Sequence, residues 1–225
     1  MATTHTQQPI STGSSVVGVC FEDGVVIAAD NLVSFGRMAR FRNCSRLYKV
    51  NETTIAGCGG DYADYQFLYN LIEQKQIDKE ANEEGVHLGP RALHSWLTRV
   101  LYNRRNKFDP LWTTWAVGGI DAGKPFLGYV DKLGTAYKDD LVTIGFGTHL
   151  AAPVIRKALE EKNGKLTRDE AIELVKKCIS LLFLRDCSAH NVYEIAVVDK
   201  KGAQVLGPYR VDSDWSLISS LRDSY

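Results

Sequence analysis

The sequence lacks an excess of charge of either sign and lacks long apolar runs. Its 27 lysines and arginines balance 27 aspartates and glutamates, so the composition does not favour a nucleic-acid partner or a strongly charged one. No apolar run reaches the roughly 18 residues that a membrane span requires. The polar start, MATTHTQQPISTG, lacks the apolar core of a signal peptide. We therefore expect no nucleic-acid partner and no membrane association.

Paired cysteines are also absent, although the chain contains five cysteines. They are odd in number, scattered and never spaced as CxxC, which argues against a disulfide framework and against a zinc site. Free thiols in a reducing cytoplasm or nucleus are the simple interpretation. The histidines have no ligand spacing either, so we expect no metal ion.

Two catalytic motifs are incomplete. Gly145-Phe146-Gly147 precedes an expected helix, but it lacks the third glycine and the GK[ST] of nucleotide-binding loops. His94, His149 and His190 occur without a G-x-S-x-G turn, which leaves a Ser/His/Asp triad unsupported. We expect no cofactor.

The chain is organised around the stretch Thr12 to Asn31, TGSSVVGVCFEDGVVIAADN. Two strands rich in Val and Ile are joined there by a tight turn that contains an Asp-Gly pair. Ser14 stands at the head of the first strand and Asp30 at the foot of the second. Short strand-like segments continue to Gly57, which indicates an antiparallel sheet.

Helical spacing and strand spacing alternate in the rest of the chain. Asp61 is suited to cap one helix and Pro90 to begin a second, and the capping box from Thr167 to Glu170 opens the last of four. Strands are expected near 113–118, 125–130, 135–137, 193–198 and 203–206, and a third helix ends near residue 163. Trp112 and Trp115 are interpreted as surface aromatics.

This order of elements predicts an α+β fold. Two stacked antiparallel sheets, each covered by a helix pair, accommodate it without burying a polar loop, so we expect a four-layer αββα sandwich. We divide the chain into an N-terminal extension (1–13), a single domain (14–207) and a C-terminal tail (208–225).

The sequence resembles the proteasome β subunits, which are N-terminal nucleophile hydrolases. The resemblance rests on the opening hairpin, on Gly59-Gly60-Asp61 and Leu184-Arg185-Asp186, and on segments such as GVVIAADN, ARFRNCSRL, GDYADYQFL, PRALHSWLTRVLYNRRNK and FLGYVDKLGTAY. In active members an N-terminal Thr attacks the peptide carbonyl, and its freed α-amine acts as the base. A Lys lowers the proton affinity of the nucleophile, and a glycine amide donates to the oxyanion.

Transferred to this sequence, the resemblance implies a degenerate site. The equivalent positions are Ser14, Asp30, Arg46, Gly60, Phe146, Asp186 and Ala189. Arg46 replaces the lysine, and a guanidinium stays charged at working pH. Phe146 and Ala189 replace supporting serines, so three polar supports are missing. We expect no catalytic residue and interpret Asp30 and Asp186 as structural carboxylates at the sheet junction.

The resemblance therefore implies a non-catalytic structural and assembly subunit of the 20S core, which supports ATP- and ubiquitin-dependent protein degradation. Its expected partners are other α and β subunits in stacked seven-membered rings, with the C-terminal tail, including Trp215 to Leu221, bridging two β rings. We expect it in the cytoplasm and nucleus. One alternative is an active endopeptidase that uses Ser14 after removal of residues 1–13. Another is a stand-alone binding module, which predicts a stable monomer.

Overall fold

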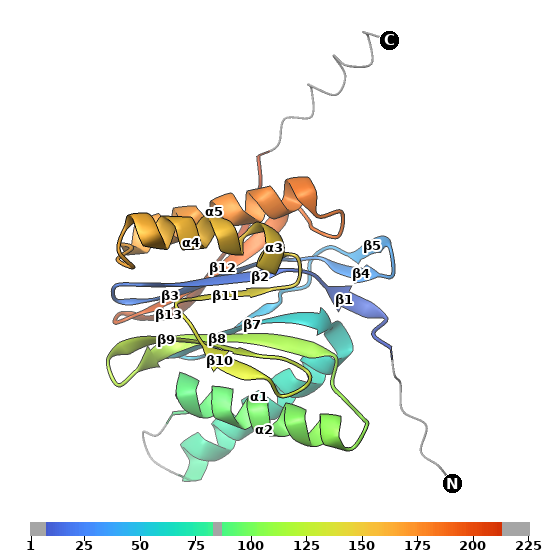
Figure 1. The fold of residues 1–225 in the computed structure, drawn as a ribbon. Helices are drawn as coiled ribbons and strands as arrows, with labels where there is room; N and C mark the ends of the chain where they lie inside the picture. The colour runs from blue at the N-terminus through green and yellow to red at the C-terminus, as the bar shows by residue number, and fades with distance from the viewer. Residues whose placement is uncertain (1–7, 83–86, 213–225) are drawn as a thin grey trace, which may run out of the picture.

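The structure is a computed structural model that describes residues 8–82 and 87–212 (Figure 1). The strands in this part are β1 (Ser11–Gly13), β2 (Val16–Phe21), β3 (Gly24–Asp30), β4 (Val33–Phe35), β5 (Met38–Phe41), β6 (Leu47–Asn51), β7 (Thr54–Asp61), β8 (Thr113–Asp121), β9 (Lys124–Val130), β10 (Ala136–Lys138), β11 (Leu141–Ile144), β12 (Val192–Asp199) and β13 (Gly202–Arg210). The helices are α1 (Tyr62–Asn82), α2 (Pro90–Asn106), α3 (Gly147–Leu150), α4 (Ala152–Glu161) and α5 (Arg168–Arg185).

The predicted opening hairpin, β2 and β3, lies at the centre of a five-stranded antiparallel sheet of order β11-β2-β3-β12-β13. Val16 pairs with Ala29, and Phe21 pairs with Gly24 at the Asp-Gly turn. Every residue of β3 is buried, because this strand is covered on both faces, which suits its Val- and Ile-rich sequence. The pairing brings the start of β2 and the end of β3, with Asp30, to the same end of the sheet.

The second sheet has eight strands in the order β10-β9-β8-β7-β1-β4-β5, and β6 pairs with β7 beside this path. β1 and β6 lie along the same edge of β7, since Gly13 pairs with Gly60 and Leu47 pairs with Gly57. The short β1 also pairs with β4 on its other side. The segment before Ser14 is thus part of this sheet.

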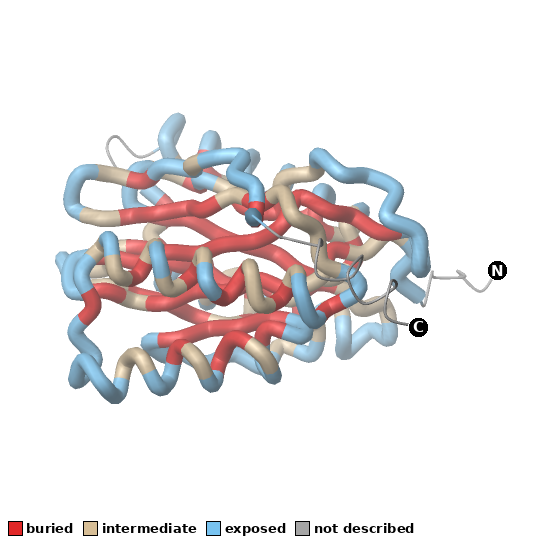
Figure 2. Tube along the Cα trace, turned by 90° about the horizontal axis from the view of Figure 1, so that it is seen from above, coloured by how far each residue is buried: buried red, intermediate tan, exposed pale blue. Residues whose placement is uncertain are grey.

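The elements stack as four layers. α4 and α5 cover the smaller sheet, the two sheets face each other, and α1 and α2 cover the larger sheet (Figure 1). Three apolar clusters fill the spaces between the layers, centred on residues such as Val175, Ile27 and Leu97. Burial is concentrated in the strands, while the helices expose their outer faces (Figure 2). The predicted α+β sandwich of αββα type is confirmed.

Several predicted elements differ in detail from the observed ones. β11 was not expected as a strand, and the expected third helix is divided into α3 and α4 at Ala151. β1 lies within the expected N-terminal extension, and β13 continues to Arg210, three residues past the expected domain end at 207. β1 carries no apolar periodicity that the sequence could show. Backbone pairing with β4 on one edge and with β7 on the other stabilises it instead.

The interpretation of Trp115 as a surface aromatic is wrong. Its side chain is fully buried in the cluster between the larger sheet and the helices. The indole nitrogen donates a hydrogen bond to Thr113 Oγ1 at 3.1 Å, and this partner allows a polar aromatic group to be buried at little cost. Trp112 is partly buried.

Two kinds of feature have no candidate among the described residues. None of their helices is long and apolar enough to cross a membrane. Within residues 8–82 and 87–212, no group of three or more His, Cys, Asp or Glu side chains is arranged to hold a metal ion. The tail segment from Trp215 to Leu221 lies outside the described residues.

Candidate functional site

The hydroxyl of Ser14 is held by a carboxylate from the helical layer. Ser14 lies between β1 and β2, and its Oγ donates to Asp186 Oδ2 at 2.7 Å. Asp186 caps the C-terminal end of α5 and is 4% exposed. Its Oδ1 accepts the backbone N–H of Ser188 at 2.9 Å. The carboxylate of Asp186 thus links β2 to the turn after α5.

Arg46 is the centre of the hydrogen-bond network, and its side chain is 2% exposed. Nη2 donates to Asp30 Oδ1 at 2.6 Å and to Ser15 O at 3.0 Å. Nη1 donates to the carbonyls of Ser14 and Cys58, both at 3.2 Å, and Nε donates to Asp30 O at 3.1 Å. All three guanidinium nitrogens are therefore used, and they join the segment before β2, the end of β3 and the middle of β7.

Asp30 is satisfied on both carboxylate oxygens. Oδ1 accepts from Arg46 and from the backbone N–H of Leu32 at 3.3 Å, and Oδ2 accepts from the backbone N–H of His190 at 3.0 Å. The His190 side chain accepts the Val192 N–H at Nδ1, and burial lowers the pKa of His190. Asp30 is 5% exposed, so its charge is compensated by these contacts and by Arg46 instead of by water.

Two glycines allow the backbones to approach closely beside Ser14. Gly60 has a φ of +104°, and a Cβ there would lie 2.2 Å from the carbonyl oxygen of Trp112. Gly13, which pairs with Gly60, leaves no room for a Cβ either, since one would lie 2.3 Å from Cδ of Arg46. Packing alone therefore requires glycine at position 60, so the presence of this glycine is no evidence that its amide donates to an oxyanion.

Phe146 and Ala189, where the resemblance implies serines in active members, contribute no hydroxyl. Phe146 lies at the start of α3, and its side chain is 55% exposed. Its neighbour Gly147 donates its N–H to Ser15 Oγ at 3.1 Å. Ala189 donates its N–H to the carbonyl of Asp186 at 3.0 Å. The structure therefore joins Ser14, Arg46 and the two aspartates in one network, with Gly60 across the sheet and Ala189 beside it.

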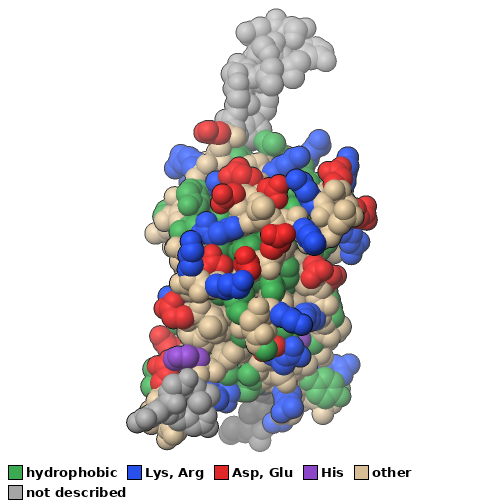
Figure 3. All heavy atoms as spheres, turned by 90° about the vertical axis from the view of Figure 1, so that its left-hand side faces the viewer, with side chains coloured by type: hydrophobic (Ala, Val, Ile, Leu, Met, Phe, Trp, Pro, Cys, Tyr) green, Lys and Arg blue, Asp and Glu red, His purple; other side chains and the backbone are tan. Residues whose placement is uncertain are grey.

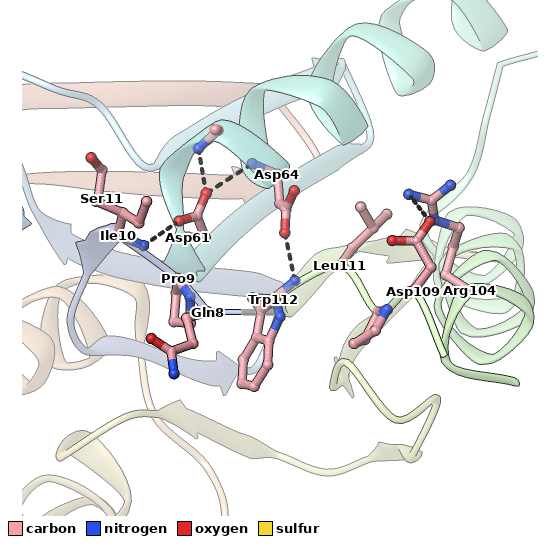
Figure 4. A pocket seen from close by; sticks show the side chains of 12 residues that line it. Gln8, Pro9, Ile10, Ser11, Asp61, Asp64, Arg104, Asp109, Leu111 and Trp112 are labelled. Carbon is pink, nitrogen blue, oxygen red and sulfur yellow. Dashed lines mark hydrogen bonds and ion pairs between the residues drawn. The ribbon is translucent and has the colours of Figure 1, made fainter. Parts of the chain in front are cut away.

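A cavity of about 480 Å³ lies beside the segment that precedes Ser14 (Figure 4). Asp61 fixes this segment, because its Oδ2 accepts the backbone N–H of Ile10 at 3.0 Å while its Oδ1 caps α1 through the N–H groups of Ala63 and Asp64. Asp64 accepts the N–H of Trp112 at 2.7 Å, and burial raises the pKa of Asp64. The predicted N-cap at Asp61 thus has a second contact.

Sequence reasoning missed the backbone part of this site. The carbonyls of Ser14, Ser15 and Cys58 accept from Arg46, and Ser15 Oγ accepts the N–H of Gly147 at the start of α3. Backbone carbonyls are present at every residue, so no sequence signal could have identified these. Gly13 does have a sequence signal, which is its position directly before Ser14 and Ser15.

Comparison with known proteins gives a consistent assignment. A family model described as "Proteasome subunit" matches residues 10–198. "Proteasome subunit beta type-4" of Xenopus laevis is 50% identical over 213 residues, which cover 95% of this chain and 88% of that protein. The protein of the same name from Drosophila melanogaster is 39% identical over 98% of this chain and 82% of its own length. "Proteasome subunit beta type-7" of Saccharomyces cerevisiae is 36% identical over 87% of this chain and 76% of its own length. This chain belongs to the proteasome subunit family.

Proposed function

We propose that this chain is a non-catalytic β subunit of the 20S proteasome core, with a structural role in the assembly. Arg46 is the observation that carries this proposal. A lysine can exchange a proton with a neighbouring hydroxyl, whereas an arginine remains charged. Here every nitrogen of the guanidinium already donates to a carbonyl or to Asp30.

The strand before Ser14 gives a second, independent support. An N-terminal nucleophile uses its own free α-amine as the base, but Ser14 follows Gly13 through a peptide bond, and an amide nitrogen is not a base. Residues Ser11 to Gly13 pair with β4 on one edge and β7 on the other. Release of the amine would require cleavage directly beside a strand that is held on both sides.

The same structural role leads us to propose where the subunit lies in the assembled core. It lies in a seven-membered β ring between an α ring and a second β ring, and its C-terminal tail contributes to the contact between the β rings. Its location is the cytoplasm and the nucleus, where the assembled core supports ATP- and ubiquitin-dependent protein degradation.

One observation favours the alternative of an active peptidase. The Ser14 hydroxyl is hydrogen-bonded to Asp186 at 2.7 Å, and a carboxylate is a possible, though weak, acceptor of its proton. This arrangement still lacks a free amine and a lysine. A peptidase that used Ser14 would also have to start its chain at that residue.

Two measurements on the assembled core test the proposal. Replacing Ser14 with Ala should leave all peptidase activities of the core unchanged, and the intact mass of the subunit should include residues before Ser14. As a matched control, the same core should lose activity when a subunit with an N-terminal Thr is given the equivalent substitution. A mass that begins at Ser14, together with covalent labelling of Ser14 by an electrophilic peptide, would overturn the proposal.

A further inference from the structure

The hairpin formed by β4 and β5 projects from one end of the larger sheet (Figure 1). We call residues 33–42 the basic hairpin. All residues from Phe35 to Asn43 are exposed without interruption. Three of them are large and apolar: Phe35 is 47% exposed, Met38 51% and Phe41 43%. An end strand with this much exposed apolar surface is open to contact with another chain.

The charge of the basic hairpin has a single sign. It carries Arg37, Arg40 and Arg42, and the sequence contains no Asp or Glu between Asn31 and Asn51. None of the ion pairs within the described residues involves these three arginines. The guanidinium of Arg40 lies over the rings of Phe35 and Phe41, at 5.8 and 5.3 Å from their centroids. This stacking combines the charge and the apolar surface in one patch.

The opposite end of the molecule differs from the basic hairpin in its distribution of charge. On that face acidic and basic side chains are interspersed (Figure 3). Lys200 pairs with Asp23 at 2.5 Å and Arg168 pairs with Asp199 at 3.3 Å. These two pairs compensate charge within the subunit, whereas none of the ion pairs between residues of 8–82 and 87–212 involves Arg37, Arg40 or Arg42.

Protection of an exposed edge does not explain the composition of the basic hairpin. Charged residues alone are enough to prevent pairing of an end strand with other chains. Exposed Phe and Met residues have the opposite effect. Aromatic residues, Met and Arg together are the residue types enriched where protein surfaces meet.

We propose that the basic hairpin docks on an acidic surface of a neighbouring subunit in the assembled core. Its arginines meet carboxylates of that surface, and Phe35, Met38 and Phe41 are covered by it. This inference rests on the proposed function, because it needs an assembled core. RNA is the other acidic partner to consider, but the zero net charge of the whole chain disfavours it.

A charge-reversal experiment tests the electrostatic part. Arg37→Glu, Arg40→Glu and Arg42→Glu are combined in one chain, which is expressed with an affinity tag beside the wild-type subunit. We expect the share of tagged chain recovered in the 20S core, measured by sedimentation and quantitative mass spectrometry, to fall roughly tenfold or more, since like charges then face each other. The triple Arg→Lys variant keeps the charge and should recover most of the incorporation.

The matched control reverses three charges elsewhere. The control uses three exposed lysines at the start of β9, in the α4–α5 loop and in the β12–β13 turn: Lys124, Lys165 and Lys201. Their combined change to Glu should leave incorporation within about twofold of wild type, because none of the three belongs to the basic hairpin. If the basic-hairpin variant assembles as well as this control, the docking inference is wrong and the assembly role stands. If the wild-type tagged chain does not enter the core, the proposed function fails and the inference fails with it.

A crosslinking experiment identifies the partner. The photoreactive amino acid p-benzoylphenylalanine is placed at Met38, and the core is irradiated and digested. We expect a crosslink to a peptide of another core subunit that is rich in Asp and Glu. Crosslinks only within this chain, to an RNA, or to a peptide without acidic residues would each overturn the inference.

Discussion

Arg46→Ala is the sharpest test of the role that we assign to the buried arginine. The substitution removes five hydrogen bonds, four of them to backbone carbonyls. It also leaves the Asp30 carboxylate, which is 5% exposed, without its positive partner. Removing one member of a buried ion pair costs about 3–5 kcal/mol, mainly because the remaining charge is buried without compensation.

This loss is large compared with the total stability of a domain. Folding free energies are about 5–15 kcal/mol, and for a chain of this size each kcal/mol lowers the melting temperature by about 2–4 °C. We therefore expect Arg46→Ala to lower the melting temperature of the purified chain by about 6–20 °C. Circular dichroism during heating and urea unfolding both measure the effect.

The control and a second variant separate the buried charge from other causes. Arg42→Ala removes an exposed arginine four positions earlier, and we expect a change within about 0.5 kcal/mol. Adding Asp30→Asn to Arg46→Ala should recover part of the lost stability, because it removes the uncompensated charge. A cost below about 1 kcal/mol for Arg46→Ala, or no recovery in the double variant, would refute the reasoning.

Three further predictions concern single positions. Gly60→Ala should lower the free energy of unfolding by at least about 2 kcal/mol, since it adds a clash to an unfavourable φ; Gly36→Ala, where φ is +58° and no atom lies within 4 Å of the new Cβ, should cost clearly less in urea titrations. The pKa of Glu170 is lowered from 4.5 to about 2 by the backbone N–H of Thr167 and by the ammonium group of Lys162. The contribution of Glu170 to stability is therefore present above pH 4.5 and is lost as the pH falls toward about 2. The urea midpoints of wild type and Glu170→Gln should therefore converge in acid, and a constant difference would contradict this. Burial raises the pKa of Asp64 above 3.8, so its contribution is present below that pH and lost as the pH rises. Asp64→Asn should therefore gain stability relative to wild type between acidic and neutral pH, and an unchanged difference in urea midpoints would contradict this.

The parts of the fold that the sequence predicts are those with local signals. The Asp-Gly turn, the alternation of apolar residues and the capping box at Thr167 each have a short-range physical cause, and the observed capping box has both of its reciprocal bonds. β1 and β11 have no such signal. They are strands because partners far away in the sequence, Gly60 for β1 and Val17 for β11, lie alongside them.

The site shows the same division. Positions such as Ser14 and Arg46 could be named from the sequence because the resemblance supplied them, and the network then brought them together. The direction of the Arg46 donors could not be predicted, since four of the five bonds end on backbone carbonyls. Likewise, Trp115 gives no sign in the sequence that Thr113 satisfies its indole nitrogen.

The geometry of Arg46 explains why a lysine would not be an equivalent residue here. An ammonium group has three donors at a single point, whereas the guanidinium has five N–H groups spread over a rigid plane. Only the second arrangement can contact the segment before β2, the end of β3 and the middle of β7 at once, through Ser14, Asp30 and Cys58. A lysine would leave some of these buried carbonyls without a donor, and each would lower stability. The residue that joins the three strands is thus also the one that places a permanently charged group beside Ser14, so the structural role and the proposed lack of catalysis both rest on Arg46.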